Sequence, residues 1–326
     1  MRKLSFILVL LLCAYSLFAQ EAEDGGMTSS RDLEIQISSL PELKLIFTQN
    51  FKFPFFPGDN PLTSGNNINL AVGGEITPVS ANLLGELVWT PIAFFQLSVG
   101  GRLGSGWPFY LFGDDPLKGV GINQPDSEGK MEYSGSGFDG ALYSAFVGGM
   151  IQMDFGLLLP WEYDHIVFQS YHEINYEGYS RAKGSQSWYY EADGGENVNG
   201  FNYYGSILLG YQIPNFFLNT IACLAEMDLY LNRPDVPGRD IWGDDLIRWH
   251  IAAVLGFTIT ANLDVKIVTQ FRTLRYFEDD STPAWRGMSI SGNPKDYYYR
   301  NRTLDTSNPT GFHFYRVAAL ITISLP

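Results

Sequence analysis

Hydrophobic and polar residues alternate along much of the chain with a period of two. Between residues 246 and 261, one face collects apolar side chains from Ile247 to Ile259, while Arg248 and His250 fall on the other. Side chains alternate between two faces in an extended strand, whereas a helix would scatter these positions around its cylinder. The pattern therefore predicts strands that have one apolar and one more polar face.

The same template fits eleven clear segments and one weaker segment at 32–38. The clear strands are predicted at 43–54, 66–77, 81–90, 92–105, 139–158, 164–179, 200–213, 215–231, 245–261, 263–277 and 309–325. In the last of these, Tyr315 and Val317 are expected on the outer, apolar face. Several segments exceed about ten residues, the length that a tilted strand needs to cross a bilayer. Twelve strands are expected, or ten if the N-terminal region is misread.

Short and long connections alternate from residue 90 onward. Short turns are expected at 89–92, 159–162, 213–215 and 260–263, and long polar loops at 106–138, 180–199, 232–244 and 278–308. Outer-membrane barrels combine short periplasmic turns with long external loops, and an even strand number leaves both chain ends in the periplasm. A soluble β-sandwich is the alternative, but it would rarely contain four irregular loops of this size.

The N-terminus has the features of an export signal. Arg2 and Lys3 precede an apolar stretch at 4–17, and Ala19 offers a small residue for cleavage. A lipoprotein signal acylated at Cys13 is the alternative. The sequence thus predicts a signal peptide at 1–19, a periplasmic segment at 20–31 and an all-β transmembrane barrel at 32–326.

Composition narrows the possible classes further. Charged residues make up only 17% of the chain and aromatic residues 15%, a mixture that suits strands with a lipid-facing side. After signal cleavage Cys223 would be the one remaining cysteine, which excludes an intramolecular disulfide. The net charge of −14 argues against nucleic acid as a partner. No later apolar stretch is long enough for a transmembrane helix, so a membrane crossing must rest on strands.

The signal peptide, the strand and loop rhythm and the apolar last strand together resemble the general class of bacterial outer-membrane β-barrels. The segments Thr90-Pro91-Ile92-Ala93-Phe94 and Gly104-Ser105-Gly106-Trp107 are similar to segments of uncharacterised spirochaete outer-membrane barrels. The resemblance implies an outer-membrane location, with membrane lipid and the barrel-assembly machinery as partners. Members of the class usually end in an aromatic residue, whereas this chain ends in Leu325-Pro326.

Charged residues on the predicted inward face are the candidate pore lining. The second strand and the last three strands contribute a mainly basic group: Lys44, Lys52, Arg248, His250, Lys266, Gln270, Arg272 and Arg316. An acidic group is expected on the opposite arc: Glu86, Asp154, Glu173, Glu177, Glu226 and Asp228. Facing walls of opposite charge would set a transverse field across a water-filled lumen. Alternatively the charges pair and plug the interior, with Glu226 or Asp228 reaching Arg248.

These patterns predict a narrow diffusion channel for small polar or charged solutes. A surface-binding barrel with a plugged lumen and a lipid-modifying enzyme are the alternatives. Lipid-modifying barrels pair a histidine with a nearby serine; no such spacing is expected here, and His172 is expected to face outward. Acidic clusters such as Asp114-Asp115 lack the spacing of a calcium loop, so neither a metal nor a cofactor is expected.

Overall fold

The computed structural model describes residues 26–40, 42–110, 117–125, 131–155, 165–183, 186, 188–191, 197–213, 216–232, 246–276 and 304–326. The signal peptide predicted at 1–19 lies outside these residues, as do most of the loops predicted at 232–244 and 278–308. Among the described residues no helix is long and apolar enough to span a membrane.

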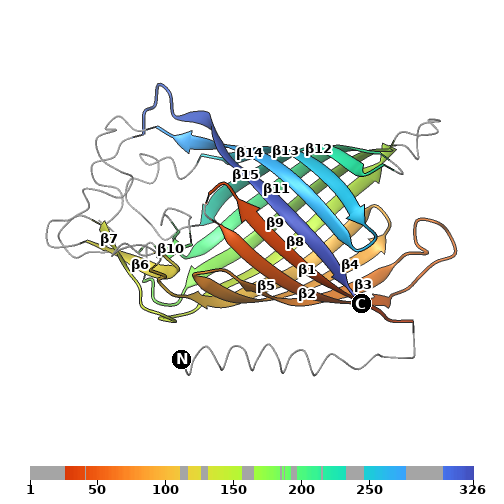
Figure 1. The fold of residues 1–326 in the computed structure, drawn as a ribbon, viewed down its shortest axis with the longest axis horizontal. Helices are drawn as coiled ribbons and strands as arrows, with labels where there is room; N and C mark the ends of the chain where they lie inside the picture. The colour runs from red at the N-terminus through yellow and green to blue at the C-terminus, as the bar shows by residue number, and fades with distance from the viewer. Residues whose placement is uncertain are drawn as a thin grey trace.

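Twelve antiparallel strands pair in a ring and close into a barrel (Figure 1). They are β1 (Thr28–Ser38), β2 (Leu43–Pro54), β3 (Asn67–Ile76), β4 (Ser80–Ile92), β5 (Phe95–Gly106), β8 (Leu142–Asp154), β9 (His165–Tyr179), β11 (Gly200–Gln212), β12 (Leu218–Asn232), β13 (Arg248–Thr260), β14 (Leu263–Arg275) and β15 (Thr310–Leu325). The prediction of a closed antiparallel barrel of about twelve strands is confirmed. The weaker candidate at 32–38 is the core of β1, which begins at Thr28.

Pairing of β1 with β15 closes the ring. Arg31 lies opposite Leu325 and Ser38 opposite Ala318, while the other edge of β1 pairs with β2. Every wall strand therefore has a partner on both sides, and the barrel has no open edge. The start of β1 and the end of β15 lie together at the mouth where β4 turns into β5 and β13 turns into β14, which we call the turn end.

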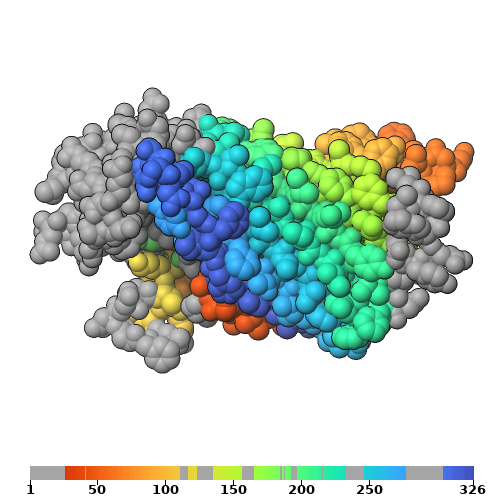
Figure 2. Space-filling model, turned by 90° about the horizontal axis from the view of Figure 1, so that it is seen from above, coloured from red at the N-terminus to blue at the C-terminus, as the bar shows by residue number. Residues whose placement is uncertain are grey.

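The wall separates apolar and polar side chains as the alternation predicts. Val147, Leu83 and Ile174 face outward with exposed fractions of 63%, 59% and 54%. Shielded polar side chains lie on the inner face, as at Asn82 and Gln270, which are 4% and 5% exposed, together with small apolar ones such as Ala252. The outer surface is continuous across neighbouring strands, from blue β15 to green β11 and β12 (Figure 2). Large apolar side chains thus lie on the outside of the barrel, the reverse of the usual arrangement in a soluble protein.

A β-bulge interrupts the alternation in the last strand. Gln270 pairs with Arg316 but Phe271 pairs with Phe314, so Tyr315 has no partner across the β14–β15 ladder. Phe314 is exposed on the outer face, whereas Tyr315 and Arg316 both lie against inward side chains. The expectation that Tyr315 faces outward is therefore wrong, because the extra residue of the bulge changes which face the chain presents.

A small second sheet lies at the opposite mouth, the loop end (Figure 1). It consists of β6 (Val120–Pro125), β7 (Met131–Ser134) and β10 (Trp188–Tyr190), in the order β10-β6-β7. The sequence indicated only irregular loops in these regions. The sheet is held by a buried apolar cluster in which loop residues meet the ends of β8 and β9: Val120, Leu142, Tyr179, Ala182 and Trp188.

Closure of the ring can be tested by cross-linking the β1–β15 seam. Ile35 lies opposite Ile321, and directly opposed residues in an antiparallel pair are within disulfide reach. In a Cys223→Ser background, the double variant Ile35→Cys/Ile321→Cys is expected to form a disulfide on mild oxidation, detected as a linked peptide by mass spectrometry. The control pair Ile35→Cys/Leu325→Cys, offset along the strand, should stay reduced. A reduced first pair in folded protein would contradict the closed ring.

Candidate functional site in the barrel lumen

Residues 188–191, here called the inserted segment, contact the inner wall at the loop end. Trp188 is fully buried in the apolar cluster, and its backbone N–H donates to the carbonyl of Asn197 at 2.9 Å. Tyr190 and Glu191 then contact polar side chains of β2 to β5. Because Trp188 is fixed by packing, the polar residues that follow it are held at one position across the lumen.

Tyr190 joins the inserted segment to three wall strands. Its hydroxyl accepts from Asn82 Nδ2 at 2.7 Å and donates to Glu75 Oε1 at 3.2 Å, while the Arg102 guanidinium carbon lies 4.8 Å from the ring centre. Burial raises the pKa of the Tyr190 hydroxyl, although nearby Arg102 acts in the opposite direction. The phenol therefore keeps its proton at physiological pH and remains a donor to Glu75.

Glu191 is held in a backbone conformation that is costly for a residue with a side chain. Its φ of 52° lies in the left-handed region, which costs of order 1 kcal/mol for a non-glycine residue. Its carboxylate accepts from Ser80 Oγ at 2.6 Å and lies 4.0 Å from Lys44 Nζ, which also pairs with Glu75 at 3.1 Å. These contacts hold the carboxylate against the wall and offset the backbone strain.

A second polar network crosses the wall on the β11 to β15 side. Tyr204 Oη donates to Glu226 at 2.6 Å, and Gln270 Nε2 donates to the other oxygen of Glu226 at 2.9 Å. Gln270 Oε1 in turn accepts from Arg316 Nε at 3.0 Å, and Arg316 pairs with Glu42 in the β1–β2 turn. Continuous hydrogen bonding of this kind keeps buried polar groups satisfied and fixes their positions.

Opposite charges are interleaved rather than placed on facing walls. Glu226 and Asp228 lie on β12, directly beside β13, so their expected position on an opposite acidic arc is wrong. The expected contact across that hairpin does form, as an ion pair between Asp228 and Arg248. Pairing between neighbouring strands lowers the cost of keeping these charges in a confined space.

The other predicted lining residues are spread along the lumen. Arg102 pairs with Glu177 at 2.9 Å. Glu173 accepts from Tyr171 and Asn175 and lies close enough to Glu86 for their charges to interact. Lys52 is exposed at the end of β2, and the Arg272 guanidinium lies over the Tyr315 ring. Among the described residues, no group of three His, Cys, Asp or Glu side chains has the geometry to hold a metal ion.

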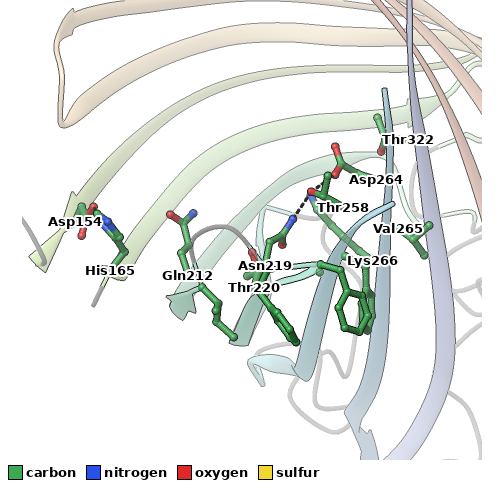
Figure 3. A pocket seen from close by; sticks show the side chains of 15 residues that line it. Asp154, His165, Gln212, Asn219, Thr220, Thr258, Asp264, Val265, Lys266 and Thr322 are labelled. Atoms are coloured by element: carbon green, nitrogen blue, oxygen red, sulfur yellow. Dashed lines mark hydrogen bonds and ion pairs between the residues drawn. The ribbon is translucent and has the colours of Figure 1, made fainter. Parts of the chain in front are cut away.

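A large cavity opens at the turn end. Its volume is about 1030 Å³, and it is lined mainly by polar side chains of β8, β9 and β11 to β15 (Figure 3). Asp154 pairs there with His165 at 2.8 Å, and Thr258 links Asn219 to Asp264. Lys266 also lines this cavity, so water at this mouth has direct access to a lumenal cation.

A smaller cavity of about 540 Å³ lies beside the inserted segment. Glu191 and Lys118 line it on the loop side, whereas Glu42, Gln270 and Arg316 line it on the wall side. The inserted segment is bonded to β2, β3 and β4, and the cavity lies between it and β1, β12, β14 and β15. The loop residues therefore narrow the lumen from one side and leave space on the other.

A cluster of three polar side chains faces outward on β9 and β11. Ser170 Oγ lies 2.9 Å from His172 Nε2, and His172 Nδ1 lies 2.6 Å from Tyr203 Oη. His172 is exposed on the outer face, as expected, but the expectation that no serine has the right spacing is wrong. Ser170 stands two residues before His172 and therefore shares its face. The three side chains satisfy one another's hydrogen bonds on an otherwise apolar wall.

Sequence reasoning missed several lumenal groups for different reasons. Glu75 and Arg102 have inward parity on predicted strands and could have been found from the alternation. Tyr190 and Glu191 lie in a region predicted as an external loop, where no periodic signal exists. The bulge that turns Tyr315 inward cannot be predicted from one sequence, because no residue type in this strand distinguishes the extra residue from its neighbours.

Comparisons with known proteins add little to the site. No protein-family model matches the chain, and no curated protein matches it significantly. A structure described as the KdgM porin shares 9% identity and covers 92% of this chain and 100% of its own, with a TM-score of 0.35. The NanC porin shares 10% identity and covers 91% of this chain and 99% of its own, with a TM-score of 0.36. OmpT, an outer membrane protein of Vibrio cholerae, shares 5% identity and covers 94% of this chain and 100% of its own, with a TM-score of 0.34. TM-scores this low establish no shared substrate or activity.

Removing the Tyr190 hydroxyl should loosen the inserted segment. In Tyr190→Phe, Asn82 and Glu75 each lose a hydrogen-bond partner while remaining buried, at a cost of about 1–3 kcal/mol. We expect faster hydrogen exchange at the amides of Trp188 and Glu191, measured by mass spectrometry on the folded barrel. The control Tyr110→Phe alters an exposed tyrosine and should leave those amides unchanged. Equal exchange in all three proteins would show that the hydroxyl does not anchor the segment.

Proposed function

We propose that this chain is a bacterial outer-membrane barrel that lets small polar or charged solutes diffuse through a narrow lumen. The observation that carries the proposal is the opposite polarity of the two faces of one closed wall. The outer face is apolar, whereas the lumen contains charged groups and has cavities of about 1030 Å³ and 540 Å³. A water-filled path is the simplest way to solvate such an interior.

The membrane location is supported by the physics of the wall. A closed sheet satisfies its backbone hydrogen bonds internally, which is the condition for crossing hydrocarbon with strands. The predicted signal peptide at 1–19 supplies the export route, and membrane lipid would cover the outer apolar face. The barrel-assembly machinery is the expected partner for insertion, although the chain ends in Leu325-Pro326 instead of an aromatic residue.

The proposed path narrows beside the inserted segment. A barrel of about twelve strands encloses only a small lumen, and Tyr190 and Glu191 occupy part of it. Solutes would pass along the cavity between Glu191 and the wall residues Gln270 and Arg316. Because groups of both signs line this passage, we expect modest overall ion selectivity.

The lipid contact can be tested at Leu255, which faces outward in the middle of β13. Leu255→Arg places a charge in hydrocarbon, which costs about 2–4 kcal/mol near the bilayer midplane. Urea unfolding in lipid vesicles should show this loss. The control Thr258→Arg adds the same charge on the inner face, beside Asp264, and should cost much less. Equal losses would contradict the assignment of the two faces.

Conduction is tested in planar bilayers with purified folded protein. We expect single-channel currents from the wild type and, for Arg316→Gln, a reversal potential shifted toward cation preference, because Glu42 then keeps its charge unpaired. The control variant is Arg31→Gln. The Arg31 guanidinium lies away from the narrow passage, where it donates to Gln49 and to the carbonyl of Pro326, so its removal should leave the reversal potential unchanged. Absence of current from folded wild-type protein would contradict the channel and favour the surface-binding alternative.

A further inference from the structure

Arg272 differs from the other arginines of the lumen because, among the residues that the structure describes, no carboxylate lies within ion-pair distance of it. The others each have a carboxylate partner: Arg102 pairs with Glu177, Arg248 with Asp228 and Arg316 with Glu42. A guanidinium that is partly shielded from water and has no counter-charge is costly to maintain. It therefore has the electrostatic character of a site that an incoming anion would complete.

The contact that Arg272 makes within the described part of the chain leaves its hydrogen-bond donors without a partner there. Its guanidinium carbon lies 4.1 Å from the centre of the Tyr315 ring. Stacking of this kind uses the flat face of the guanidinium, whereas the N–H donors lie in its plane and point outward from its edge. A planar edge with paired donors matches the two oxygens of a carboxylate or phosphate.

Tyr315 reaches this position only because of the β-bulge. If the alternation set by outward Val317 continued without the extra residue, Tyr315 would face outward as well. Turned inward, its ring also lies 5.1 Å from the Arg316 guanidinium carbon and 5.7 Å from the centre of the His250 ring. One aromatic ring thus gathers two arginines and a histidine on the same part of the wall, and bulges often re-aim side chains at functional sites.

The group lies at the entrance to the narrow passage. Arg272 stands two residues nearer the loop end than Gln270, and both have inward parity on β14. Gln270 and Arg316 line the 540 Å³ cavity. The free edge of Arg272 therefore lies on the loop side of the two β14–β15 residues that line the cavity.

We propose that Arg272, stacked on Tyr315, binds a small oxyanion of the carboxylate or phosphate class at the loop-side entrance to the narrow passage. The Arg316 guanidinium, 5.1 Å from the centre of the same ring, is the second cation of this group. The inference rests on the proposed channel function, because it names the class of solute that the lumen attracts. Binding itself can be measured without conduction, which keeps the two proposals separable.

The test uses the full folded chain in detergent micelles and isothermal titration calorimetry with gluconate, inorganic phosphate and uncharged sorbitol. Wild-type protein is expected to bind at least one of the two anions and not sorbitol. Arg272→Gln should weaken that binding about tenfold or more, since it removes a charge-assisted contact. Arg272→Lys keeps the charge but lacks the planar edge, so its anion affinity should lie between those of the wild type and Arg272→Gln. The control Lys183→Gln removes an exposed charge outside the lumen and should bind as the wild type does.

Each outcome decides a stated point. Stronger binding of gluconate assigns a carboxylate, and stronger binding of phosphate assigns a phosphoryl group. Anion binding that is unchanged in Arg272→Gln, or absent from the wild type, overturns the site. Heat-modifiable gel migration of each variant shows that the barrel is folded. Conduction without anion binding would remove this site and leave the channel, whereas anion binding without conduction would retain the site and contradict the channel.

Discussion

The structure depends on one constraint of extended chains: neighbouring residues point to opposite sides. In a closed sheet those sides become an outside and an inside, so each strand serves two environments at once. On β13, exposed Leu255 lies between inward Val254 and Gly256. The apolar wall and the polar lumen are therefore two aspects of a single pattern, and neither can be changed by a one-residue slip without changing the other.

Polar contacts, more than the apolar packing that orders a soluble domain, hold the described side chains of the lumen in place. Ion pairs and shared hydrogen bonds hold the wall side chains in fixed positions, as in the link from Tyr204 through Glu226 to Gln270. The buried apolar cluster around Trp188 lies at the loop end and positions the inserted segment. Polar contacts thus position the side chains along the wall, whereas apolar packing positions the loop segment at one mouth.

The sequence predicts the wall well and the contents of the lumen poorly. Strand positions follow from local alternation, and the inward parity of residues such as Lys44 and Arg248 follows with them. The partner of each charged residue does not follow from local alternation. Asp228 pairs with Arg248 because their strands are neighbours, and Glu191 approaches Lys44 from a loop that is distant in the sequence. The orientation of Tyr315 does not follow from the sequence for a third reason. A β-bulge changes the face on which a residue lies, but the alternation of residue types along the sequence stays the same. The alternation of a strand depends only on neighbouring residues, whereas contacts across the barrel depend on how the whole chain folds.

The seam between β1 and β15 has a consequence for folding kinetics. Arg31 donates to the carbonyl of Pro326, 295 residues further along the chain. The hairpin of β13 and β14, by contrast, closes through a turn at residues 261 and 262. Loop-closure entropy makes contacts of great sequence separation slow to form, so hairpins would precede the seam. Until β1 meets β15 the nascent sheet has two unpaired edges, and the interval before closure is when the chain is most prone to aggregate.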